Sequence, residues 1–282
     1  MCYNYCGGYI IMNYDILINN FLNVLNNFVT EQEFSYIKQK LLKVNIQYSP
    51  DNNPLLPAGS CGHMGDIAIH ENNEMVLYHE LFHAISTYYS DNTDINTDII
   101  KSGFHHQQKN KQNIGFGLNE GYTEFITAKY FGTGNSDRYE NEFHYASLIE
   151  LLIGEKEMFQ YYLNSNLDGL IDRISMYNSK EKVINFLENL DLFIILKEIL
   201  KEKEVSNTPS LEDLQYWENF RNKFEQTHYE LTNFILESFS NKYLTSPNEL
   251  EKDKMVTLIS NFMKNNGYTF DINSELNGHS RR

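Results

Sequence analysis

A chain of 282 residues, 41% of them hydrophobic, is long and apolar enough to bury a substantial core as one large domain or two ordinary ones. Its formal net charge of −15 opposes binding to nucleic acids and to anionic membranes, because both require clustered Lys and Arg side chains. We therefore expect a globular protein that binds a peptide or a protein, with neither a nucleic acid nor a membrane as its partner.

The N-terminal sequence and the cysteines indicate a cytoplasmic location. The first basic residue is Lys38, so no positive region of a secretory signal is recognised, and no apolar run approaches the ~18–20 residues of a membrane span. Cys2, Cys6 and Cys61 are odd in number, which suits a reducing compartment better than a disulfide framework.

The first fifty residues are predicted to form two helices and a strand. Residues 1–12 lack a helical period and are expected to be extended or irregular. Apolar residues recur at helical spacing over 14–29, and a capping box from Thr30 to Glu33 marks the start of the next helix. Apolar and polar residues then alternate over 44–48, which predicts a strand.

A second, β-branched strand is predicted at residues 66–70. At the edge of a sheet, such a strand has unpaired backbone groups that can hold an extended peptide by strand addition. The alternative is a strand with a purely structural role.

The most informative stretch is the H-E-x-x-H sequence at residues 79–83, inside a helix predicted over 73–89. Residues four apart on a helix share one face, about 5–6 Å apart at Cβ, so His79 and His83 can bind one metal ion. Glu80 is rotated by about 100° from His79 and can take a proton from a metal-bound water. The pattern predicts a zinc site with a general base beside it; two histidines on an ordinary helix are the alternative.

A catalytic zinc site needs a third protein ligand and an open position for water. Glu120 follows Asn119, which can cap a helix, and a carboxylate in the first helical turn is favoured by the helix dipole. Glu124 lies one turn later on the same face and can accept the remaining ring N–H of a ligating histidine. Glu120 is therefore a candidate for the third ligand, and Glu124 is a candidate partner for the ring N–H of a ligating histidine.

Other residues compete for places around the metal. His105 and His106 are rival third ligands, in a polar segment at 89–113 that is expected to loop over or beside the cleft. Cys61 is a further candidate, as an inhibitory thiolate on the zinc, with a free thiol as its alternative.

These motifs, together with Asn119-Glu120-Gly121, resemble the gluzincin superfamily of zinc metallopeptidases, which includes thermolysin-like proteases and aminopeptidases with an Asn-Glu-Gly helix. The similarity covers residues 66–131. It implies that both motif histidines and the downstream Glu bind Zn²⁺, that the motif Glu is the general base, and that a second Glu orients a histidine. In this chain the ligands implied by the resemblance are His79, His83 and Glu120. The implied general base is Glu80, and the residue that orients a histidine is Glu124.

In gluzincins a Tyr or His that follows the ligand Glu stabilises the oxyanion of the reaction. The candidates are Tyr139, His144 and Tyr145. We favour Tyr139, because a turn at 132–137 can bring the start of the next helix back to the cleft.

From residue 138 onward the pattern is almost entirely helical. We expect a predominantly helical α+β fold of the zincin-like type, with a strand-containing catalytic lobe at 1–132 and an all-helical lobe at 133–282 that closes the cleft. The expected function is zinc-dependent hydrolysis of a peptide bond, as an endopeptidase or an exopeptidase. The alternative is a non-catalytic, zinc-stabilised helical protein with an interaction or regulatory role.

Overall fold

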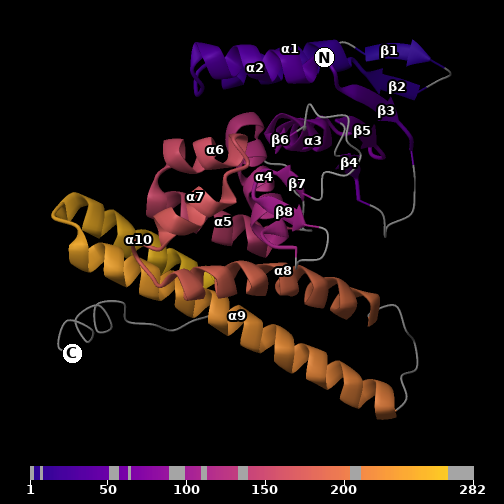
Figure 1. The fold of residues 1–282 in the computed structure, drawn as a ribbon. Helices are drawn as coiled ribbons and strands as arrows, with labels where there is room; N and C mark the ends of the chain where they lie inside the picture. The colour runs from indigo at the N-terminus through magenta and orange to yellow at the C-terminus, as the bar shows by residue number, and fades with distance from the viewer. Residues whose placement is uncertain are drawn as a thin grey trace. The chain divides into compact units, whose positions relative to one another are not determined.

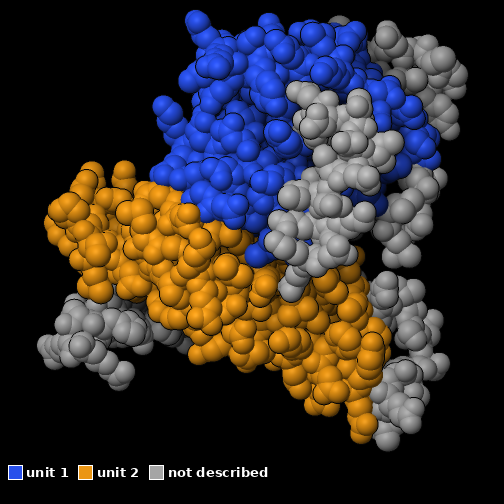
Figure 2. Space-filling view, in the orientation of Figure 1, with its two compact units in different colours: residues 1–147, 154–169 blue, residues 148–153, 170–282 orange. Residues whose placement is uncertain are grey.

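The computed structural model describes residues 3–6, 9–50, 57–62, 65–88, 99–108, 113–132, 139–203 and 211–265. The chain divides into two compact units (Figure 2). Unit 1 comprises residues 1–147 and 154–169, and unit 2 comprises residues 148–153 and 170–282. The predicted lobes at 1–132 and 133–282 stay a prediction.

Unit 1 combines helices with short strands (Figure 1). Its strands are β1 (Tyr3–Cys6), β2 (Tyr9–Met12), β3 (Asn45–Tyr48), β4 (Gly59–Cys61), β5 (Asp66–Ile69), β6 (Thr87–Tyr88), β7 (Ile99–Ser102) and β8 (His105–Gln108). Its helices are α1 (Tyr14–Leu25), α2 (Glu31–Leu41), α3 (Glu74–Ser86), α4 (Phe116–Phe131) and α6 (Glu155–Leu163), with the first parts of α5 (Glu140–Ile153) and α7 (Leu167–Ile174).

Helices are the secondary-structure elements of unit 2 within its described residues. It holds the remaining parts of α5 and α7, followed by α8 (Lys180–Lys203), α9 (Leu211–Thr245) and α10 (Glu249–Asn265). The predicted fold class, α+β and predominantly helical, is thereby confirmed. No helix within the described ranges has the length and apolar character needed to cross a membrane.

Strands β1 and β2 form a two-stranded antiparallel sheet, and the first of two three-stranded sheets has the strand order β3-β5-β4. β5 pairs in parallel with β3 and in antiparallel with β4. The strand predicted at 66–70 is therefore confirmed, but its position at the sheet edge was wrong, because both of its sides are paired. The edge positions belong to β3 and β4.

The second three-stranded sheet has the order β6-β7-β8, and both of its strand pairs are antiparallel. Its strands β7 and β8 lie within the segment 89–113 that was expected to be a loop, so this expectation was wrong for residues 99–102 and 105–108. Residues 89–98 and 109–112 lie outside the described part of the chain. The strands of this sheet are rich in polar residues, so the sequence does not show the alternating pattern of a strand. Pairing with neighbouring strands stabilises them.

Local signals in the first half of the chain match the structure. Thr30 is the N-cap of α2, and the capping box is present: Glu33 Oε2 accepts from the Thr30 backbone N–H at 2.7 Å, and Thr30 Oγ1 accepts from the Glu33 N–H at 3.3 Å. Asn13 caps α1 in a similar way. Cys2 lies outside the described residues.

Helix α3 is central to unit 1. Every residue from Leu77 to Ser86 is buried, because α3 packs against the β3-β5-β4 sheet as well as against α4. Phe82 is fully buried and packs edge-on against Phe21 of α1, with ring centroids 4.8 Å apart. The histidines of the motif are thus held by a helix that cannot shift without disturbing the core.

The C-terminal end of α3 is fixed by a buried lysine. Lys40 Nζ donates to the carbonyl oxygens of Ile85 at 2.6 Å and Thr87 at 2.7 Å. Carbonyl groups at a helix C-terminus lack intrahelical partners and carry partial negative charge, so an amine is a favourable partner there. α2 therefore anchors the end of the helix that carries His79 and His83.

Helices α4 and α5 approach closely at Gly121, where a Cβ atom would collide with the backbone of Glu142. Gly121→Ala is expected to lower the free energy of unfolding by about 1–3 kcal/mol, measured by urea denaturation. The direction of this change tests the close approach of the helices, because Gly→Ala inside an unobstructed helix raises the free energy of unfolding by up to about 1 kcal/mol. A variant as stable as the wild type would contradict the close approach.

Candidate metal centre

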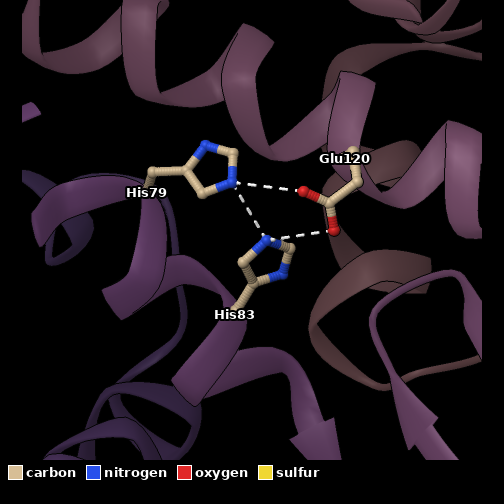
Figure 3. A group of neighbouring side chains, drawn as sticks. All are labelled: His79, His83 and Glu120. Atoms are coloured by element: carbon tan, nitrogen blue, oxygen red, sulfur yellow. Dashed lines mark hydrogen bonds and ion pairs between the residues drawn. The ribbon is translucent and has the colours of Figure 1, made fainter. Parts of the chain in front are cut away.

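Three buried side chains converge between α3 and α4 (Figure 3). His79 Nε2 lies 3.5 Å from Glu120 Oε2, His83 Nε2 lies 3.4 Å from Glu120 Oε1, and the two Nε2 atoms are 3.1 Å apart. The residues are only 8%, 8% and 9% exposed, in the order His79, His83 and Glu120. This group could hold a metal ion.

The spacing of these atoms fits a small tetrahedral ion. Ligand atoms at 2.0–2.2 Å from zinc in a tetrahedral arrangement are about 3.3–3.6 Å from one another. The separations from Glu120, 3.4 Å through Oε1 and 3.5 Å through Oε2, lie within that range, and the 3.1 Å between the two Nε2 atoms lies slightly below it. Two imidazoles and one carboxylate are also a donor set that suits zinc among the common divalent ions.

Glu120 does not lie in the first turn of its helix. The N-cap of α4 is Gly115, with φ of 85°, and Asn119 lies inside the helix with its backbone N–H donating to the Gly115 carbonyl. The expectation that Asn119 caps this helix was therefore wrong, and so was the helix-dipole argument for Glu120. Burial raises the pKa of Glu120, but the facing His83 and His79 outweigh burial and hold the pKa below its usual value.

Glu124 lies one turn beyond Glu120 and contacts the other side of His79, with Oε2 3.0 Å from Nδ1. Burial disfavours a charged His79, but the hydrogen bonds with Glu120 and Glu124 outweigh burial and raise its pKa to about 10. Nδ1 of His79 is hydrogen-bonded to the Glu124 carboxylate, so Nε2 is the ring nitrogen that faces Glu120.

Glu80 is 6% exposed and does not belong to the three-residue group. Burial raises the pKa of its carboxyl, and the nearby His79 and His83 oppose that effect. Strand β4 lies directly against this carboxyl: a Cβ atom at Gly59 would stand 3.0 Å from Glu80 Oε1. A side chain at position 59 would therefore displace Glu80 or the strand.

The rival histidines do not join the group. His106 Nε2 lies 2.9 Å from the Ser165 carbonyl oxygen, and burial lowers its pKa. His105 packs edge-on against Phe116, with ring centroids 5.4 Å apart. Within the described residues, the group of three consists of His79, His83 and Glu120.

Cys61 lies on β4, and its Sγ donates to the Gly62 carbonyl at 3.6 Å. Burial and the charges of Glu80 and Asp66 raise the pKa of the thiol. A thiol with a raised pKa is a poor metal ligand, because the thiolate is the binding form. Cys61 is not a member of the metal-binding group.

The candidates for the oxyanion donor are placed differently. The Tyr139 ring, just before α5, stacks on the His79 ring with centroids 6.3 Å apart and an interplanar angle of 12°. Tyr145 is 1% exposed, whereas His144 is exposed and packs against Phe143. Tyr139 therefore has a ring contact with a histidine of the group. Residues 133–138, the expected turn, lie outside the described part of the chain.

Asn119 has a contact that the sequence pattern did not reveal. Its Nδ2 lies 3.3 Å from His83 Nδ1, and its Oδ1 accepts from the Phe104 backbone N–H at 3.0 Å. The available signal was an amide side chain next to a predicted ligand, which was interpreted as a helix cap. Each histidine of the group thus has a different partner behind it.

α3 and α4 together provide a His-His-Glu group with a second carboxylate, Glu80, beside it. Such a group can bind a divalent cation and leave a position for a water molecule. Comparison of the chain with protein-family models, with curated proteins and with solved structures finds no match.

Proposed function

We propose that this protein is a zinc metallopeptidase of the gluzincin type, in which Zn²⁺ is bound by His79, His83 and Glu120. The observation that carries the proposal is the buried His-His-Glu group, with interatomic distances that suit zinc. The zincin-like description of the fold is part of the same proposal.

When bound, the zinc ion supplies a polarised water and a Lewis acid for the scissile carbonyl. Glu80 would take the proton of the attacking water and pass it to the leaving amine as the C–N bond breaks. The Tyr139 hydroxyl donates a hydrogen bond to the carbonyl oxygen as negative charge develops on it. Glu124 keeps His79 in its orientation through the 3.0 Å contact.

An extended peptide is the substrate that best suits the surroundings of the group. β4 is at one end of the strand order β3-β5-β4, and an end strand can pair with an added strand. Gly59 of β4 lies against Glu80. A peptide paired with β4 would therefore lie beside Glu80, the proposed general base. We thus propose β4 as the peptide-binding strand, in place of residues 66–70.

The alternative is a zinc-stabilised protein without catalysis, which acts by binding a partner. A structural zinc site has four protein ligands, whereas a catalytic site has three. Among the described residues the group has three members. The group therefore favours catalysis.

The proposal is tested with purified protein and a mixture of unstructured peptides, analysed by mass spectrometry. We expect about one zinc per chain by elemental analysis, cleavage of peptide bonds, loss of cleavage after chelation, and recovery when zinc is restored. A protein that binds no zinc would overturn the proposal. A protein that binds zinc but cleaves no peptide would also overturn it, if the absorption spectrum of its cobalt-substituted form indicates four protein ligands.

A further inference from the structure

The side chain of His105 lies on the accessible face of strand β8. Successive residues of a strand point to opposite faces, and the residues here differ in burial accordingly. Phe104, just before the strand, is fully buried and His106 is 6% exposed, whereas His105 is half-buried and Gln107 is exposed. His106 therefore faces the core of unit 1, and His105 shares the opposite face of β8 with Gln107.

Two contacts place His105 beside the first turns of helix α4. The His105 ring packs edge-on against Phe116, with ring centroids 5.4 Å apart and an interplanar angle of 68°. The backbone N–H of Phe104, the residue before His105, donates to Asn119 Oδ1 at 3.0 Å. Phe116 precedes Glu120 by four residues, so these two side chains lie on one face of α4. The His105 imidazole is thus held next to the helix face that carries Glu120.

The charges of the metal-binding group act on the His105 ring. Burial lowers the pKa of His105, Glu120 raises it, and His83 lowers it further. Two members of the group therefore lie close to His105, which is not itself a member. A neutral imidazole at this position has one N–H that can donate a hydrogen bond.

The proposed mechanism does not use this imidazole. The proposed oxyanion donor, Tyr139, stacks on His79, and the proposed base, Glu80, lies against strand β4. His105 instead approaches from β8, and the charges that act on it are those of the other two members of the group. A peptide bound across the group would therefore have a further hydrogen-bond donor beside it.

We propose that His105 is a substrate-binding residue whose ring N–H donates a hydrogen bond to a backbone carbonyl of the peptide, next to the scissile bond. This inference rests on the proposed function and deepens it, because it assigns a residue to substrate binding. The carbonyl that His105 contacts is not the one under attack, so the bond is equally strong in the substrate complex and in the transition state. Its loss should weaken binding and leave the turnover number unchanged.

Two replacements separate the hydrogen bond from the packing contact. His105→Phe keeps an aromatic ring against Phe116 but has no N–H, whereas His105→Gln loses the ring and keeps an amide donor. Each is combined with Glu80→Gln, so that a fluorescein-labelled peptide that the wild type cleaves stays intact. The dissociation constant for this peptide, measured by fluorescence anisotropy, should rise about 3- to 10-fold with His105→Phe and stay within about twofold with His105→Gln.

Gln107→Ala is the matched control, because Gln107 lies on the same face of β8 and is exposed. Its dissociation constant should stay within about twofold of the parent protein. With Glu80 intact, His105→Phe should raise KM by about the same 3- to 10-fold at an unchanged kcat and full zinc content.

The outcomes distinguish this inference from the proposed function. A His105→Gln protein that binds the peptide no more tightly than His105→Phe would overturn the inference, as would loss of zinc from either variant. A wild-type protein that cleaves no peptide would overturn the proposed function, and this inference with it.

Discussion

Glu80→Gln is expected to lower the turnover number for peptide hydrolysis by at least about 100-fold while about one zinc per chain remains bound. Glutamine has nearly the same shape as glutamate but cannot accept the proton of the attacking water. Glu80 is not part of the His79, His83 and Glu120 group, so its replacement removes no metal ligand. Turnover is measured on a peptide that the wild type cleaves, and zinc by elemental analysis.

Glu74→Gln is the matched control for this experiment. Glu74 lies in the first turn of the same helix and undergoes the same chemical change. Its turnover number should stay within about twofold of the wild type. Undiminished peptidase activity in Glu80→Gln would remove Glu80 from the mechanism, even if zinc is bound.

Glu120→Ala is expected to abolish stoichiometric zinc binding. It removes one of three ligands and leaves two histidines. The affinity for zinc should therefore fall by more than the ~10- to 100-fold that is typical when a residue hydrogen-bonded to a ligand is replaced. The change also removes the carboxylate that faces both Nε2 atoms. Zinc content after dialysis against a weak chelator is the measurement, with Glu120→Gln as a variant of the same size.

His105→Ala tests one of the two rival histidines for the third ligand position. We expect this variant to retain zinc, because His105 packs against Phe116 and lies outside the group. Full zinc content in Glu120→Ala combined with loss in His105→Ala would assign the third position to His105 and overturn the ligand set.

The contrast between Glu120 and the rival histidines also marks the limit of the sequence. Spacing along one helix places His79 and His83 on the same face, since that geometry is fixed by the 3.6-residue period. Nothing local connects either of them to Glu120, which reaches the group only because α4 packs against α3. The motif pattern selected Glu120 among the three candidates, but the reason first given for its charge, a place in the first helical turn, was wrong.

By itself, the sequence determined the elements whose signals are local: the capping box at Thr30, the strands near residues 45–48 and 66–69, the helix that carries the histidines, and the helical second half. Tertiary structure alone decided that β5 is an inner strand, that residues 99–102 and 105–108 form strands, and that Asn119 faces His83. Strand order and side-chain partners depend on contacts between residues far apart in the chain. Periodicity and capping describe only neighbours, so they cannot fix which amide or carboxylate is placed behind each histidine.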